Sequence, residues 1–222
     1  MKEIIANENI FHDNDKIADE LRNIFKERKI LTINFLGSPG AGKTRLLEKV
    51  INSMKDKISI SVIEGDLYTS KDSQRIEKQG VNVIQINTVG GCHLDAPMIK
   101  KSINYINIEK TDLIIIENVG NLVCPASYDL GEDMRVLVMS VTEGNDKPLK
   151  YPTMFQKASL VIINKMDLIE YTDFNLMDFY RDLYLVNPHV RVIETSCTKN
   201  LGINKVAQGL YHEIKIKKNE NI

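Results

Sequence analysis

One stretch constrains the fold of this chain more than any other: residues 37–44, which read GSPGAGKT. It matches the phosphate-binding pattern G-x-x-x-x-G-K-[ST] at every fixed position. In that pattern the glycines let successive backbone N–H groups close around a phosphate, the lysine reaches the β- and γ-phosphates, and the hydroxyl binds Mg²⁺. The residues expected to contact a nucleotide here are Gly37, Ser38, Pro39, Gly40, Ala41, Gly42, Lys43 and Thr44.

The residues on either side of this loop favour the same interpretation. The apolar run at 30–36 (ILTINFL) predicts a strand, and apolar residues at helical spacing predict a helix after the loop: Leu46, Leu47, Val50, Ile51 and Met54. The loop amides would then lie at a helix N-terminus, which favours anions. The alternative is a chance glycine-rich turn between a strand and a helix.

The rest of the chain alternates short apolar runs with helical patterns. Strands are expected at 58–63, 81–86, 113–116, 135–141, 159–163 and 190–193, and helices at 97–105, 174–186 and 203–216. This alternation predicts an α/β fold, a P-loop NTPase domain with a mostly parallel, doubly wound sheet and helices on both faces. Such sheets bind ligands beyond the carboxyl ends of their strands.

The chain divides into a short leading segment and one domain. Residues 1–29 are expected to form a helical lead-in, and residues 30–222 the P-loop domain, since no linker interrupts them. Asp13 or Asn14 could cap the first helix. Its expected apolar face is Ile17, Leu21, Ile24 and Phe25.

Composition narrows the class of protein. Lys plus Arg (29) nearly balance Asp plus Glu (30), so the charge footprint of a dedicated nucleic-acid-binding protein is missing. No run approaches the roughly 18 apolar residues of a membrane span, and residues 1–16 lack the apolar core of a signal peptide. We therefore expect a cytoplasmic protein with neither a nucleic-acid nor a membrane partner. The 3 cysteines are too few for a disulfide framework.

A second motif indicates which nucleotide is bound. The strand at 160–163 ends in Asn164, Lys165, Met166 and Asp167, the N-K-x-D pattern by which GTPases read guanine. An Asp167 carboxylate can accept from guanine N1–H and from its exocyclic amine, whereas adenine offers an acceptor at N1. Ser196 and Cys197, after the next strand, would complete the base pocket. The alternatives are an Asn-Asp turn that closes a strand, and a small-molecule kinase that uses ATP.

Hydrolysis of GTP needs Mg²⁺ and a positioned water. Asp66, at a strand end, is the expected carboxylate for Mg²⁺ together with Thr44, and Asp72 is a candidate for positioning water. Glu117, at the end of the most apolar strand, and Gly120 resemble the γ-phosphate sensor of GTPases, although Glu replaces the usual Asp. Lys43, Asp72 and Glu117 are thus the expected catalytic residues, and Asp66 and Asp72 could instead be solvated loop residues.

Three soft ligands suggest a second site. Cys92 and His93 lie beyond a strand end, and Cys124 is four residues past Gly120, at most about 14 Å away. Two thiolates and an imidazole suit Zn²⁺ or Ni²⁺, with water or a second subunit completing the shell. The alternative is that the cysteines are buried small hydrophobic residues and His93 caps a helix.

Four segments together resemble one known family. The motifs ENVGNLVCPA at 117–126, CHLDA at 92–96 and EGNDKPLKYP at 143–152, with the phosphate loop, resemble HypB, the nickel-incorporation GTPases of [NiFe]-hydrogenase maturation. The resemblance implies a GTPase domain of the SIMIBI class and a nickel or zinc site at Cys92, His93 and Cys124. It also implies a homodimer that forms with GTP, a partner metallochaperone HypA, and delivery of nickel to the hydrogenase large-subunit precursor.

The chain departs from that family in two respects. Residues 1–29 contain no cysteine and only His12, so a high-affinity nickel store is not expected. The phosphate loop lacks an early signature lysine, and Lys147 or Lys150 is a candidate for a lysine acting across the dimer, or a solvated surface residue. The alternatives at this level are a urease-accessory-type GTPase, expected to use Cys-Pro-His, and a purely structural zinc at a dimer interface.

Overall fold

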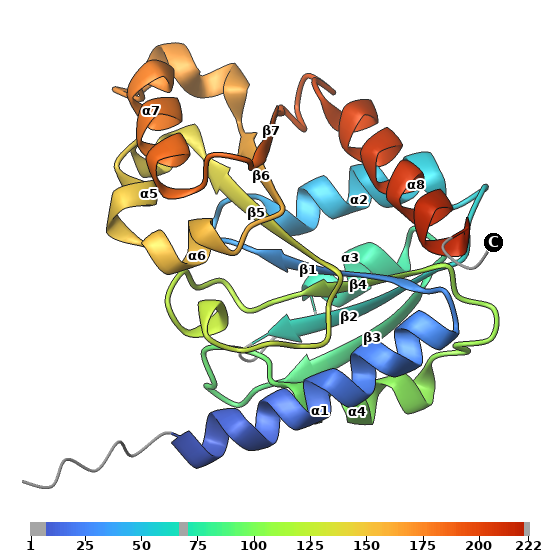
Figure 1. Cartoon of the computed structure of the whole chain (residues 1–222). Coiled ribbons are helices and arrows are strands. Elements are labelled where there is room, and N and C mark those ends of the chain that lie inside the picture. The colour runs from blue at the N-terminus through green and yellow to red at the C-terminus, as the bar shows by residue number, and fades with distance from the viewer. Residues whose placement is uncertain (1–7, 67–70, 220–222) are drawn as a thin grey trace, which may run out of the picture.

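Seven parallel strands form one sheet in the order β3-β2-β4-β1-β5-β6-β7 (Figure 1). We describe the chain from a computed structural model, which covers residues 8–66 and 71–219, without the side chains of residues 8–11, 71 and 72. The strands are β1 (Leu31–Leu36), β2 (Ile60–Asp66), β3 (Asn82–Asn87), β4 (Leu113–Glu117), β5 (Met134–Ser140), β6 (Leu160–Asn164) and β7 (Arg191–Glu194). The pairings between these seven strands are all parallel, which confirms the expected sheet.

Helices cover both faces of this sheet. They are α1 (Glu8–Glu27), α2 (Lys43–Met54), α3 (Lys71–Glu77), α4 (Ala96–Ser102), α5 (Lys147–Lys150), α6 (Pro152–Gln156), α7 (Leu176–Val186) and α8 (Ile203–Asn219). Four 3₁₀ turns join them: η1 (Ile103–Tyr105), η2 (Cys124–Ala126), η3 (Val141–Glu143) and η4 (Met166–Tyr171). None of the helices within the described ranges has the length and apolar character needed to cross a membrane.

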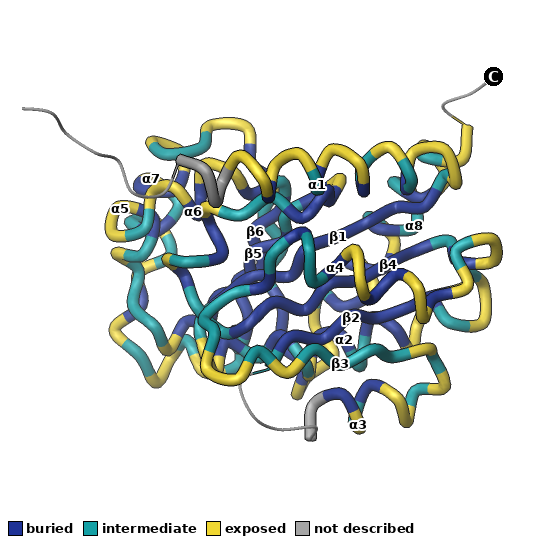
Figure 2. The backbone as a smooth tube through the Cα atoms, turned by 90° about the horizontal axis from the view of Figure 1, so that it is seen from below, coloured by how far each residue is buried: buried dark blue, intermediate teal, exposed yellow. Residues whose placement is uncertain are grey.

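The alternation of side chains along the central strands explains the two layers of helices. In β4, Leu113 and Ile115 join the core beneath α2 and α8, whereas Ile114 and Ile116 join the core beneath α1 and α4. On the side of the sheet that α1 and α4 cover, the part over β5 and β6 is covered by α6 and α7, whose Phe155 and Phe179 belong to a further apolar core. The middle strands of the sheet are buried, as their dark blue colour in Figure 2 shows, so a strand such as β4 can be apolar on both of its faces.

Helix α1 differs from the expectation at its start. It already includes Glu8, so Asn14 lies within the helix, buried, and the predicted cap at Asp13 or Asn14 is wrong. The Asn14 side chain instead donates to the Asp129 carbonyl and accepts from the Ala96 amide, each at 2.9 Å. Tertiary partners more than 80 residues away therefore decide its role. The apolar face was predicted correctly, since it packs on the second core.

A buried ion pair fixes the loop between η2 and β5. Arg135 Nε donates to Glu132 Oε1 at 2.6 Å, and the two side chains are 11% and 3% exposed. The same guanidinium donates to the carbonyl oxygens of Ala126 (3.1 Å) and Tyr128 (2.9 Å). One arginine thus neutralises a buried acid and anchors the loop backbone.

Removing this arginine should destabilise the fold strongly. We expect Arg135→Ala to lower the free energy of unfolding by about 3–5 kcal/mol, because Glu132 would keep a buried charge without its counter-ion. Arg28→Ala is the matched control: Arg28 pairs with Glu109 and both side chains are exposed, so the loss should stay below about 1 kcal/mol. Urea denaturation of both variants measures the difference, and equal losses would contradict the interpretation.

Candidate functional site

The phosphate loop joins β1 to α2 in a conformation that its glycines permit. At Gly37, with φ +150°, a Cβ would lie 2.1 Å from the Val138 carbonyl oxygen, and at Gly42, with φ +94°, a Cβ would lie 2.5 Å from Asn164 Nδ2. Neither position can carry a side chain. Helix α2 begins at Lys43, so the loop amides precede a helix N-terminus as expected.

The two polar side chains of the loop face inward. Lys43 is only 8% exposed, and its Nζ donates to the Gly37 carbonyl at 3.3 Å. The Thr44 hydroxyl donates to Glu117 Oε1 at 2.7 Å. The predicted Mg²⁺ ligand of the loop is thus in contact with the predicted γ-phosphate sensor on β4.

These groups line a cavity of about 450 Å³, within the range of small-molecule sites. Besides the loop, the cavity wall includes Glu64, Asp66, Glu117, Asn118 and Gly120. The register of the sheet explains this gathering, because Glu64 of β2 lies directly opposite Glu117 of β4. Hydroxyl and carboxylate oxygens are the ligands that Mg²⁺ prefers, so Thr44 with the acids at these strand ends fits that ion.

Gly120 lies against the phosphate loop. A Cβ there would be 3.0 Å from the Pro39 nitrogen. The residue that follows, Asn121, forms an isolated antiparallel bridge with Gly37. The segment after β4 is therefore in backbone contact with the loop expected to hold the phosphates.

Some lining residues were not predicted, and one predicted residue is not described. Arg45 and Arg75 line the cavity, and Arg75 makes two hydrogen bonds with Glu48, at 3.0 and 2.9 Å. No motif marks either arginine. Asp72 belongs to α3, but its side chain lies outside the described residues.

A larger hollow, of about 710 Å³, lies at the opposite end of the strands. Lys55, Ser61, Asn82 and Thr111 contribute to its wall, and none of the predicted site residues does. The residues there form no described catalytic or metal-binding cluster. The smaller cavity is therefore the better candidate for the nucleotide site.

The N-K-x-D residues lie beyond β6, next to the phosphate loop. Asn164 is 2% exposed: its Nδ2 donates to the Ala41 carbonyl at 2.9 Å and its Oδ1 accepts from the Thr195 hydroxyl at 3.1 Å. Its side chain thus ties the loop to β6 and to the segment after β7. Lys165 adopts a left-handed φ of +61°, which turns the chain toward Asp167.

Asp167 is positioned by Ser196, whose buried hydroxyl donates to Oδ1 at 2.5 Å. The neighbouring Cys197 is buried, with its thiol 3.7 Å from Asn164 Oδ1. Burial raises the pKa of this thiol, so Cys197 stays a protonated packing residue. Asp167, Ser196 and Cys197, which the sequence predicts to lie together, are neighbours in the structure.

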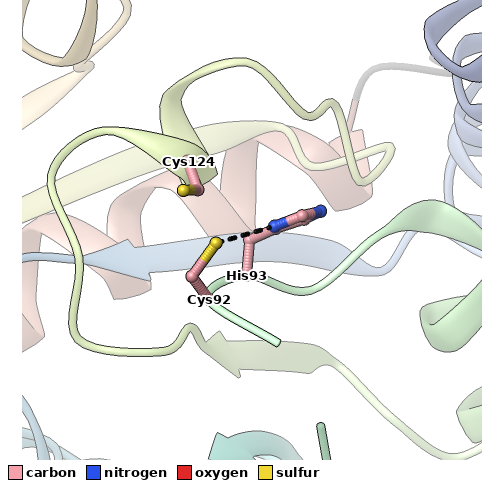
Figure 3. Close-up of side chains that lie close together, drawn as sticks. All are labelled: Cys92, His93 and Cys124. Atoms are coloured by element: carbon pink, nitrogen blue, oxygen red, sulfur yellow. Dashed lines mark hydrogen bonds between the residues drawn. The ribbon is translucent and has the colours of Figure 1, made fainter. Parts of the chain in front are cut away.

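Cys92, His93 and Cys124 form a second cluster on the same edge of the sheet. One ligand atom of each residue lies within 4.8 Å of the other two. Cys92 Sγ and His93 Nδ1 are 3.6 Å apart, and Figure 3 shows both cysteine sulfurs close to this nitrogen. The three residues are half-buried. Two sulfurs and an imidazole nitrogen at this spacing can surround one Zn²⁺ or Ni²⁺ ion and leave a position open.

The surroundings favour the metal-binding form of His93, whereas Cys92 is held as a thiol until a cation is present. Burial lowers the pKa of His93, which keeps the imidazole neutral. The Tyr128 ring stacks on it at a centroid distance of 3.8 Å. The hydrogen bond with Cys124 raises the pKa of Cys92, since two neighbouring thiolates repel unless a cation lies between them.

The alternative role of His93 as a helix cap is wrong. Asp95 is the N-cap of α4, and its carboxylate accepts from the Met98 amide at 2.8 Å. His93 therefore precedes the helix and is available to the cluster. Its position is fixed through the next residue, Leu94, whose amide donates to Asn118 Oδ1 at 3.1 Å.

Comparison with known proteins agrees with this geometry. Residues 31–194 match the family described as "CobW/HypB/UreG, nucleotide-binding domain". The chain is 47% identical to the hydrogenase maturation factor HypB of Rhizobium leguminosarum bv. viciae, over 90% of this chain and 67% of that protein. It is 43% identical to the hydrogenase/urease maturation factor HypB of Helicobacter pylori, over 86% of this chain and 80% of that protein.

A solved structure shows the same fold. The crystal structure of HypB from Helicobacter pylori in complex with nickel is 39% identical, with a TM-score of 0.87, over 91% of this chain and 95% of that chain. The resemblance predicted from the motifs at 92–96 and 117–126 is confirmed. This chain belongs to the HypB family of hydrogenase maturation factors, among the CobW/HypB/UreG nucleotide-binding proteins.

Proposed function

We propose that this chain is a GTP-hydrolysing metallochaperone that binds nickel, or zinc, and helps insert nickel into [NiFe]-hydrogenase through GTP-dependent dimerisation. One observation carries the proposal: Cys124 of the three-ligand cluster is four residues beyond Gly120, which packs on the phosphate loop. A change of nucleotide at the loop must therefore act close to a metal ligand. Membership of the HypB family supports the same function.

At the nucleotide side, each residue has a defined part. The loop residues 37–44 bind the phosphates, with Lys43 reaching the terminal phosphates, and Thr44 and Asp66 hold Mg²⁺. Glu117 and Gly120 sense the γ-phosphate, and Asp72 positions the attacking water. At the base, Asp167 accepts from guanine, supported by Ser196, whereas Asn164 and Cys197 hold the surrounding loops.

At the metal side, Cys92, His93 and Cys124 bind the ion that is delivered. The position they leave open suits a transfer site, in which a further ligand comes from water, a second subunit or the acceptor protein. Two exposed apolar residues, Val89 (78%) and Val123 (62%), flank the ligands and suit a contact with another copy of the chain. HypA and the hydrogenase large-subunit precursor are the partners, in the cytoplasm.

Lys147 and Lys150 remain candidates for a lysine that acts across the dimer. In the single chain Lys150 pairs with Asp146 at 2.9 Å, and Lys147 Nζ lies 5.7 Å from the centre of the Tyr151 ring. Both interactions are at the surface and can be exchanged for others.

A second function is delivery of nickel to urease. The observation that favours it is the relative from Helicobacter pylori named as a hydrogenase/urease maturation factor. Both functions use the same nickel-loaded state. Nickel loading of each enzyme in cells that lack this chain, with and without its gene restored, separates the two.

Nucleotide should change the affinity for nickel. We expect the Ni²⁺ dissociation constant with GDP to differ by about fivefold or more from that with a non-hydrolysable GTP analogue, a usual size for coupled sites. Isothermal titration measures both constants and the number of ions per chain. Equal affinity and equal stoichiometry in the two states would rule out equilibrium coupling.

Loss of Cys124 should remove most nickel binding. We expect Cys124→Ala to weaken Ni²⁺ binding by roughly tenfold or more while GDP binding is retained, because one of three ligands is gone. His189→Ala is the matched control, since His189 is exposed and outside the cluster. Metal analysis of the purified variants is the measurement. Retention of nickel by Cys124→Ala would argue against this site.

Loss of Asp167 should remove the preference for guanine. In Asp167→Ala we expect GDP binding to weaken on the order of 100-fold, because the guanine N1–H and amine would lose their acceptor. The exposed Asp173→Ala is the control. Competition of GDP against ATP measures the preference. If ATP bound as tightly as GDP to the unaltered protein, the alternative of a small-molecule kinase that uses ATP would be favoured instead.

A further inference from the structure

The backbone that carries His93 is held by a side chain of the nucleotide cavity. Asn118 follows β4 directly, lines that cavity, and is 2% exposed. Its Oδ1 accepts from the Leu94 amide at 3.1 Å and from the Val119 amide at 2.9 Å. One oxygen atom therefore joins the residue after the metal ligand His93 to the segment that leads to Gly120.

The Leu94 side chain is restrained from the same direction. It is fully buried and packs on Gly65 of β2, where an added Cβ would lie 2.8 Å from three of its carbon atoms. Gly65 also lines the nucleotide cavity and precedes Asp66. Both the amide and the side chain of Leu94 are thus set by strand ends that face the nucleotide.

Asn118 is itself held firmly in its orientation. Its amide N–H donates to the Phe35 carbonyl at 3.0 Å, and its Nδ2 donates to Asn34 Oδ1 at 3.3 Å. Asn34 in turn donates to Glu132 Oε1 at 3.3 Å. Because Nδ2 has this partner, Oδ1 is directed toward Leu94. A movement of the β4 end therefore moves the Leu94 amide, because the Asn118 side chain is not free to rotate and absorb it.

Another anchor of the same loop comes from α1, away from the nucleotide cavity. Asn14 of α1 accepts from the Ala96 amide at 2.9 Å, three residues after His93. Asn14 is buried between α1 and the loops, and it does not line the nucleotide cavity. The loop from β3 to α4 is thus held from α1 near its end, and from the nucleotide side both by Asn118 and, at its start, by the Asp66 carbonyl, which accepts from the Thr88 amide at 2.9 Å.

We propose that Asn118 is the positioning residue that couples nucleotide state to the Cys92–His93 half of the metal site. The inference rests on the proposed function and adds to it a second route. Cys124 is displaced through the backbone from Gly120, whereas His93 is displaced through the hydrogen bond from Asn118 to Leu94. When residues 117–120 shift with the γ-phosphate, both halves of the ligand set move, and the distance between them changes.

The test compares two asparagines that hold the same loop. In the unaltered protein the ratio of Ni²⁺ dissociation constants with GDP and with a non-hydrolysable GTP analogue should be about fivefold or more. In Asn118→Ala this ratio should fall toward one by about twofold or more, with GDP still bound, because only the displacement of Cys124 through Gly120 remains. In Asn14→Ala nickel binding should weaken equally in both states and leave the ratio unchanged. An unchanged ratio in Asn118→Ala overturns the inference but leaves the proposed function intact.

A measurement on the unaltered protein covers the case in which Asn118→Ala fails to fold. Hydrogen exchange of the Leu94 amide should differ severalfold between GDP and the GTP analogue, while that of Ala96 changes less. Equal exchange at Leu94 in both states overturns the inference. If the Ni²⁺ dissociation constants with GDP and with the GTP analogue are equal in the unaltered protein, the coupling in the proposed function is overturned, and the inference with it. If exchange at Leu94 still depends on the nucleotide in that case, the loop moves without affecting the metal.

Discussion

The site depends on the common direction of the strands. Seven parallel strands deliver every following loop to one edge, so the phosphate loop, the N-K-x-D residues and the cysteine loops meet although they are far apart in sequence. A parallel sheet must be covered on both faces, which the helices achieve with two apolar layers. The predicted site residues thus gather at this edge, and the sheet holds their loops at a fixed spacing.

Buried amide side chains connect the loops that the sheet brings to this edge. Asn164 joins the phosphate loop to the base-reading segment, and Asn118 joins the β4 end to the cysteine loop. An asparagine can donate and accept at the same time, so a single side chain satisfies backbone groups of two loops that would otherwise be buried unpaired. Neutral amides do this without the desolvation cost of a charge. Each of these side chains thereby links two loops where they meet.

Much of this arrangement could be predicted from the sequence, because short motifs carry their own geometry. The phosphate loop, the strand that ends at Asn164 and the proximity of Cys92, His93 and Cys124 all follow from local patterns and strand ends. The positions of Asn14, Asn118 and Arg135 could not be predicted. Their partners are distant loops, and a polar residue within an apolar pattern does not reveal which backbone group it will meet. The cap proposed at Asn14 failed for this reason, since the residue prefers caps in general but has a tertiary partner here.

The division of the metal ligands between two loops has a kinetic consequence. Cys92 and His93 are adjacent on one loop, and Cys124 is on another. An ion held by all three would link the loops, and the third ligand would act at the high effective concentration of a tethered group. Separating the loops would reduce the site to two neighbouring donors on a single turn. The lifetime of the bound ion is then set by how often the loops part, so a protein of this design can hold an ion tightly and still surrender it quickly.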